Sequence, residues 1–142
     1  HFYEYGISKN EGNYKFFEPK NKSGSFSLHD LQKTGKYFYA PFKTLTNVMN
    51  DLGHDHIDLI KIDVEGEEYN LINLIYEKKI PIKIICIEYD EFYHPMDNNY
   101  VSRVKSSLEK LYDIGFKIVE DQGRGNYTLF NVNFSKKVIN KF

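Results

Sequence analysis

Two apolar segments separated by a helical stretch constrain the fold more than any other feature of the sequence. Residues 57–63 (IDLIKID) and 80–88 (IPIKIICIE) are rich in isoleucine and show little polar alternation, which is typical of parallel strands covered on both faces. Residues 67–78, which lie between them, place their apolar side chains at helical spacing. This order predicts a strand–helix–strand unit with a right-handed crossover.

The remaining elements extend the same alternation of strands and helices. Strands are expected at residues 1–8, 14–18 and 37–43, a helix with Thr44 as its N-cap at 45–52, a helix at 100–114, and a hairpin of strands at 116–120 and 127–133. Such an order predicts an α/β domain with a mainly parallel sheet, to which the C-terminal hairpin adds an antiparallel edge.

Composition excludes several classes of protein. Hydrophobic residues make up 41% and charged residues 27% of the 142 residues, which excludes a disordered chain. The net charge of −1 offers no basic excess for binding nucleic acid, and no apolar run reaches the about 20 residues needed to span a bilayer. A single cysteine, Cys86, cannot form an internal disulfide, which fits a reducing, cytoplasmic setting.

Candidate functional residues lie near the ends of the expected strands, because ligands of open α/β sheets bind beyond the carboxyl ends of the strands. Ser8, Asp63 and Glu88 occupy such positions. The densest cluster is the octet KIDVEGEE at residues 61–68, in which Asp63 and Glu65 follow a buried-type strand. Gly66 allows close backbone approach or an unusual φ at this turn.

The acidic residues of the octet have more than one possible use. Asp63 and Glu65 can bind a cation, accept hydrogen bonds from hydroxyl or amino groups, or act as a general base. Charged groups at the end of a buried strand are costly without a partner, which favours a function for this pair. Glu67 and Glu68 are expected instead to stabilise the N-terminus of the following helix.

The octet also carries a family resemblance. Together with the Thr44-Leu45 helix start before it and the strand that ends in Ile87-Glu88 after it, it resembles the FkbM family of S-adenosylmethionine-dependent methyltransferases. Residues 2–8 resemble the third core strand of that family, residues 14–28 the strand and loop that follow, and residues 37–45 the extended run into the helix. The resemblance covers residues 1–134 and implies a Rossmann-like methyltransferase fold.

One part of the family pattern is absent. Such methyltransferases begin with a strand and a glycine-rich loop that cradles the cofactor, followed by a strand that ends in an acid, whereas the Gly-x-Gly at residues 123–125 falls in a hairpin turn. The chain also begins with His1. The resemblance therefore implies that residues 1–134 are the C-terminal portion of a methyltransferase domain, a partial Rossmann-like fold in which the N-terminal cofactor-loop strands are missing. Residues 135–142 are expected to form a tail, and the chain alone is expected to be inactive.

The resemblance also implies roles for individual residues. Asp63 would lie close to the transferable methyl group with Glu65 beside it, and Glu88 and His94 would share the role of general base. Ser8 and Asp63 would contact the cofactor, S-adenosylmethionine. The implied reaction is O-methylation of a small hydroxylated or sugar-like acceptor, and no metal ligand is assigned.

Two alternatives stay open. Asp63 and Glu65 could hold Mg²⁺ or Mn²⁺ in a metal-dependent nucleotide-sugar transferase, or the chain could be a non-catalytic α/β binding module. The expected partner is a small-molecule acceptor, with no nucleic acid and no membrane. If the strands that flank the first and fourth core strands are missing, an exposed sheet edge remains, and the chain is expected to self-associate through it.

Overall fold

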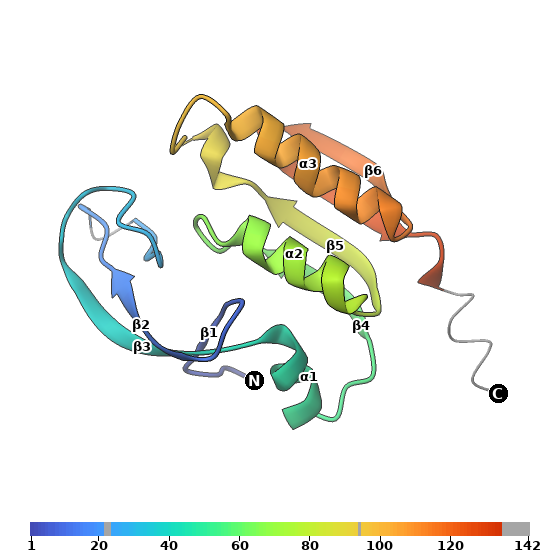
Figure 1. Ribbon diagram of the computed structural model, residues 1–142, viewed down its shortest axis with the longest axis horizontal. Helices are drawn as coiled ribbons and strands as arrows, with labels where there is room; N and C mark the ends of the chain where they lie inside the picture. Colours follow the sequence, from blue (N-terminus) through green and yellow to red (C-terminus); the bar gives the residue numbers. More distant parts are fainter. Residues whose placement is uncertain (22–23, 94, 135–142) are drawn as a thin grey trace.

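The computed structural model describes residues 1–21, 24–93 and 95–134 (Figure 1). A small sheet has the strand order β1 (Gly6–Ile7), β3 (Tyr37–Lys43), β2 (Gly12–Phe17), and a larger sheet has the order β4 (Ile57–Ile62), β5 (Ile82–Glu88), β7 (Asn126–Asn131), β6 (Phe116–Gly123). The helices are α1 (Leu45–Asp51), α2 (Glu68–Lys78) and α3 (Tyr100–Asp113), with a short 3₁₀ helix η1 (Asp90–Phe92) after β5. The α/β class is thereby confirmed.

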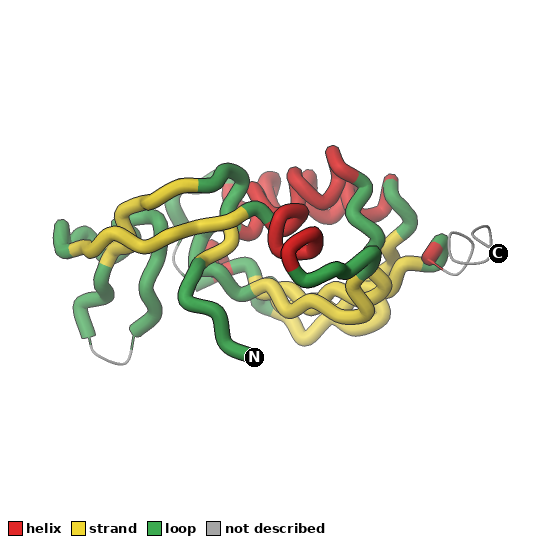
Figure 2. The backbone as a smooth tube through the Cα atoms, turned by 90° about the horizontal axis from the view of Figure 1, so that it is seen from below, coloured by secondary structure: helices red, strands yellow, loops and turns green. Residues whose placement is uncertain are grey.

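The predicted strand–helix–strand unit is present. Strands β4 and β5 pair in parallel, and α2 connects them. Figure 2 shows the helices on one side of the larger sheet. On that side Ile72 and Ile75 of α2 are fully buried together with Ile85 of β5 and Leu129 of β7, and each such side chain contributes about 1.5–3 kcal/mol of burial free energy.

The C-terminal hairpin adds an antiparallel edge to the larger sheet, as predicted. Strand β7 lies inside the sheet, antiparallel to β5 on one side and to β6 on the other. The larger sheet thus has one parallel and two antiparallel strand pairs, and the small sheet has one of each. A mainly parallel sheet is not confirmed. After β5 the chain passes through α3 and forms β6 at the edge of the sheet. The turn after β6 then places β7 between β6 and β5.

Strand β4 is covered on one face only within the described residues, so the prediction of two covered faces is wrong for this strand. The pairing register places Leu59, Ile84 and Phe130 in one row. Leu59 is 57% exposed and Phe130 is 37% exposed, because the described helices pack against the opposite face. In the described part of the chain β4 is also an edge strand.

The N-terminal segments differ from the prediction in length. The strand expected at residues 1–8 comprises only Gly6–Ile7, since the residues before it have no strand to pair with in the described structure, and Phe2 is 87% exposed. The predicted N-cap is confirmed, because the amide of Asn47 donates to Thr44 Oγ1 at 3.2 Å at the start of α1.

The small sheet ends in a loop that reaches toward the larger sheet. An isolated β-bridge joins Phe17 of β2 to Ser27 of this loop, and the rings of Phe16, Phe26 and Phe38 pack against one another at centroid distances of 5.6–5.7 Å. This loop positions the residues that contact the turn between β4 and α2. None of the helices in the described part of the chain is long and apolar enough to cross a membrane.

Candidate active site

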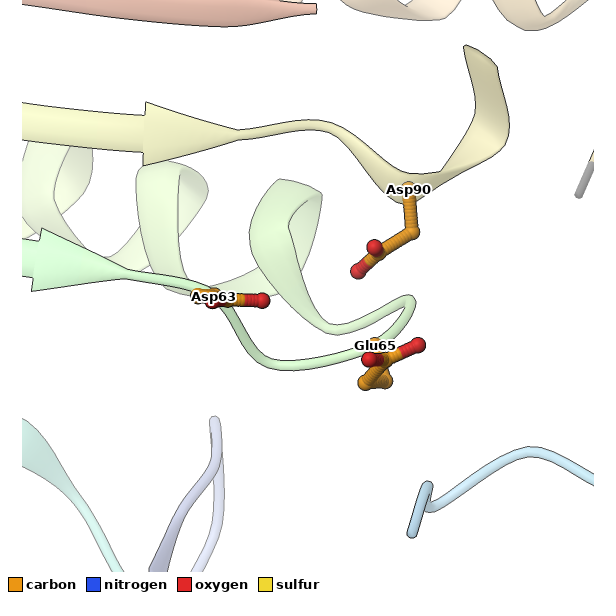
Figure 3. A group of neighbouring side chains, drawn as sticks. All are labelled: Asp63, Glu65 and Asp90. Carbon is orange, nitrogen blue, oxygen red and sulfur yellow. The ribbon is translucent and has the colours of Figure 1, made fainter. Parts of the chain in front are cut away.

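Three carboxylates meet at the tips of β4 and β5. Asp63 directly follows β4, Glu65 lies in the turn before α2, and Asp90 begins η1 after β5. One oxygen from each side chain lies within 4.8 Å of the others. Figure 3 shows the three side chains at the ends of the two strands. Parallel strands end at the same edge of a sheet, so Asp63 and Glu65 were expected at this edge. The structure places them there and adds Asp90.

The turn that carries Glu65 is held from inside by Glu68. Glu65 has φ of 50° and Gly66 has φ of 105°, conformations that glycine adopts far more readily than other residues. The amide of Gly66 donates to Glu68 Oε1 at 2.9 Å, and Glu68 is fully buried. The side chain of Glu68 therefore holds the turn in place. Glu68 lies in the first turn of α2, where the sequence predicted an acidic residue that stabilises the helix N-terminus.

A second set of contacts holds the turn from the loop after β2. The hydroxyl of Ser27 donates to the carbonyl oxygen of Glu65 at 2.6 Å and accepts a hydrogen bond from the amide of His29 at 2.9 Å. His29 Nε2 pairs with Glu67 Oε1 at 2.8 Å, and Asn70 Nδ2 also donates to Glu67. Glu67 occupies the N-cap position of α2, at the helix N-terminus as predicted, but its side chain makes no capping hydrogen bond.

The pairing of His29 with Glu67 shifts the pKa values of both side chains in the direction that favours their charged forms. The hydrogen bond to Glu67 raises the pKa of His29 above its usual value. Burial works to raise the pKa of Glu67, but hydrogen bonds from His29 and Asn70 outweigh it and hold that pKa below its usual value. The pair therefore links the loop after β2 to the candidate site, by an ion pair when His29 is protonated.

Asp90 lies in an unusual electrostatic setting. Burial and a hydrogen-bonding contact with Glu68 raise the pKa of Asp90 to about 8, and burial likewise raises the pKa of Glu68. Asp90 Oδ2 and Glu68 Oε2 are buried and accept no hydrogen bond from another donor group of the described residues, so the hydrogen-bonding contact between the two side chains requires a carboxyl proton. Two carboxylates in contact repel each other when both are ionised, so a proton or a positive charge between them is favoured.

Asp63 is the most accessible member of the cluster. Its side chain is 38% exposed and forms an ion pair with the ammonium group of Lys61, which is itself 61% exposed. Hydrogen bonding to Asp63 raises the pKa of Lys61. Asp63 is thus able to interact with a ligand at the sheet edge.

A cavity of about 260 Å³ lies between this strand tip and the small sheet. Its lining combines aromatic and acidic side chains: Phe16, Phe26, Phe42, Asp63, Glu65 and Glu67 are among the residues that form it. Aromatic faces provide apolar contact area, whereas carboxylates accept hydrogen bonds from hydroxyl groups. A small ligand with both an apolar face and hydroxyl groups fits this lining.

Ser8 lies away from the carboxylate cluster. Its hydroxyl donates to the carbonyl oxygen of Asn10 at 2.6 Å, and it lines a neighbouring cavity of about 490 Å³ together with Tyr14 and Asn70. The structure therefore does not bring Ser8 and Asp63 into one cavity.

The second predicted pair is only partly visible. Glu88 ends β5, is partly buried and accepts a hydrogen bond from Asn126 Nδ2 at 3.4 Å. It is not part of the cluster of Asp63, Glu65 and Asp90. His94 lies outside the described residues. The cluster instead includes Asp90, which lies two positions after Glu88 at the start of η1.

The fold and the cluster define an α/β domain with a candidate active site at the tips of two parallel strands. The family model of the methyltransferase FkbM domain matches residues 1–118, and the chain therefore belongs to the FkbM methyltransferase family. The match includes the small sheet, the strand–helix–strand unit and α3, and it ends within β6. No curated protein and no solved structure matches the chain.

Proposed function

We propose that this chain forms the acceptor-binding part of an S-adenosylmethionine-dependent methyltransferase that O-methylates a small hydroxylated or sugar-like acceptor. The observation that supports this most strongly is the aromatic cavity beside Asp63 and Glu65, in a chain that belongs to a methyltransferase family. Family membership also favours methyl transfer over nucleotide-sugar transfer and over a non-catalytic binding module.

The described residues fit one side of the cofactor. When bound, S-adenosylmethionine supplies an electrophilic methyl group on a positively charged sulfur, and Asp63 offers a carboxylate of opposite charge at the strand tip. Ser8 and Asp63 are the proposed cofactor contacts. Among residues 1–21, 24–93 and 95–134 no glycine-rich loop follows a strand and opens a helix. In this proposal the loop that holds the rest of the cofactor comes from outside these residues.

The residues of the chain would act mainly on the acceptor. The rings of Phe16, Phe26 and Phe42 would contact its apolar face, and the carboxylates of Asp63 and Glu65 would accept hydrogen bonds from its hydroxyl groups. This arrangement fixes one hydroxyl oxygen for attack and gives its proton an acceptor. Positioned general bases contribute about 10²–10⁴-fold to a rate. We assign the proton to Asp63 because its side chain lines the cavity and stays partly exposed.

Glu88 and His94 are proposed as supporting residues of the base. Glu88 lies at the tip of the neighbouring strand β5, and a histidine can exchange protons near neutral pH. The proposed setting is the cytoplasm, which the single free thiol of Cys86 suits, and the proposed partner is the small-molecule acceptor.

The experiment measures transfer of a labelled methyl group from S-adenosylmethionine to a panel of monosaccharides, glycosides and small alcohols. It uses the protein encoded by the complete gene and compares Asp63→Asn and Glu65→Gln with the wild type. Asp58→Asn is the matched control, because Asp58 is an exposed acid on β4 outside the cluster.

We expect the wild type to methylate at least one hydroxylated acceptor and Asp63→Asn to lower kcat by about 10²–10⁴-fold. The control should keep wild-type kcat and KM. Absence of transfer to every acceptor, or equal kcat in Asp63→Asn and the wild type, would contradict the proposal.

A further inference from the structure

We infer that Asp63, Glu65 and Asp90 form a divalent-cation site at the tips of β4 and β5, beside the aromatic cavity. The site would take an ion that prefers oxygen ligands, such as Mg²⁺ or Mn²⁺. Binding of the ion is independent of the proposed methyl transfer, whereas the role of the ion in handling the acceptor rests on that proposed function.

The spacing of the carboxylates suits one ion. One oxygen from each of the three side chains lies within 4.8 Å of the others. Two ligands of the same ion lie at most twice the metal–oxygen distance apart, which is about 4.2 Å for Mg²⁺ and about 5 Å for Ca²⁺. Adjacent ligands of an octahedral Mg²⁺ lie about 3 Å apart, so the three oxygens, now within 4.8 Å of one another, would approach by up to about 2 Å through side-chain rotation.

Unsatisfied buried oxygens beside the cluster provide a second, separate observation. Asp90 is only 8% exposed, and its Oδ2 has no hydrogen-bond donor in the described structure. Figure 3 shows its carboxylate directed toward the side of Asp63 and Glu65. Glu68, which contacts Asp90, is fully buried and has an Oε2 that also lacks a donor. A buried carboxylate oxygen without a donor is costly, and a cation would remove that cost.

Charge balance points the same way. Within the described residues none of Glu65, Glu68 and Asp90 forms an ion pair with a basic side chain. The ammonium of Lys61 pairs with Asp63 alone, and the side chain of Lys61 is 61% exposed, so it can rotate into solvent when an ion takes its place. Within the described residues Lys61 thus offsets the charge of Asp63 and interacts electrostatically with Asp90, and the negative charge of the cluster exceeds what this lysine balances.

The position of the site suggests what the ion would do. Asp63 and Glu65 line the cavity, so coordination positions that the protein leaves open would face a ligand there. A hydroxyl oxygen bound to such an ion loses its proton more readily than a free hydroxyl. Glu68, which contacts Asp90, would orient the Asp90 carboxylate toward the ion, as residues behind the metal ligands commonly do.

The rival explanation is a proton shared between Asp90 and Glu68, and a direct binding measurement separates the two. Mn²⁺ is titrated into the protein without cofactor or acceptor, and free Mn²⁺ is followed by electron paramagnetic resonance. The variants are Asp90→Asn and Asp63→Asn, with Asp58→Asn as the control. Because the side chain of Asp63 is partly exposed, its variant reports on the site even if Asp90→Asn fails to fold.

We expect one saturable Mn²⁺ per wild-type chain, affinity at least about tenfold weaker in Asp63→Asn and Asp90→Asn, and wild-type affinity in Asp58→Asn. Saturable binding that neither cluster variant weakens would overturn the inference. So would a wild type without saturable binding below about 1 mM, the weak end of natural sites. If the protein binds Mn²⁺ but transfers no methyl group, only the proposed function is refuted. If it transfers methyl groups equally well with a chelator present and binds no Mn²⁺, only the cation site is refuted.

Discussion

Replacement of Gly66 by alanine tests how the candidate site is held together. Gly66 has φ of 105°, and a Cβ atom built on it would lie 3.0 Å from Cδ2 of His29. Its amide also donates to Glu68 Oε1. A methyl group at this position therefore strains the turn and pushes on the ring that pairs with Glu67. The substitution perturbs both sets of contacts that hold Glu65 in place.

The expected cost follows from these contacts. A residue with a side chain held at such a positive φ costs about 1–3 kcal/mol, and a weakened hydrogen bond between His29 and Glu67 adds about 0.5–1.5 kcal/mol. We expect Gly66→Ala to lower the free energy of unfolding by about 1.5–4.5 kcal/mol. Gly53→Ala is the matched control, because Gly53 has φ of 69° with nothing within 4 Å of the added Cβ, and it should cost about 1–2 kcal/mol.

Urea denaturation followed by circular dichroism measures both variants. The same pair made in a His29→Ala background isolates the contact with the ring, and there the cost of Gly66→Ala should fall. Equal losses of unfolding free energy in Gly66→Ala and Gly53→Ala, unchanged by removal of His29, would refute this account of the turn.

Three further predictions concern other parts of the molecule. His29→Gln should lower the free energy of unfolding by about 0.5–1 kcal/mol between about pH 5 and 6.5. The loss should shrink as the pH rises through the raised pKa of His29 or falls through the lowered pKa of Glu67. A loss that urea denaturation shows to be independent of pH contradicts this. Arg103→Met leaves Glu91, whose side chain is 2% exposed, without its ion pair. The variant should lower the free energy of unfolding by about 3 kcal/mol. A loss below about 0.5 kcal/mol in thermal unfolding would show that other groups stabilise the Glu91 carboxylate without Arg103. The open edge at β4 should produce concentration-dependent dimers in sedimentation velocity, which Leu59→Lys reduces, and a monomer at every concentration would contradict it.

Local patterns predicted the elements whose formation depends on neighbours in sequence. The strand–helix–strand unit around α2 follows from apolar runs and helical spacing, and the start of α1 follows from Thr44, whose hydroxyl accepts from Asn47. The place of β7 between β5 and β6 depends on which strand fills the gap next to β5. That choice is a matter of long-range pairing, and the sequence of a hairpin carries no signal for it.

The same distinction separates the site residues. Asp63 and Glu65 were predicted because they lie at the end of the apolar run that forms β4 and in the turn just after it. Asp90 was missed, although the same strand-tip argument reaches it when η1 after β5 is included. Ser27 and His29 lie 38 residues before the groups that they contact, and they sit in a polar loop whose residues give no sign of a distant partner.

The central claim is that the strand tip at Asp63 faces the cofactor of a methyltransferase. Calorimetric titration of S-adenosylmethionine into the protein encoded by the complete gene tests it most directly. The account predicts saturable heat of binding for the wild type and for Asp58→Asn, and affinity at least about tenfold weaker for Asp63→Asn, because an interaction of the cofactor with a charged group contributes about 1.5–3 kcal/mol. No heat of binding in the wild type, or equal affinity in Asp63→Asn, would contradict it.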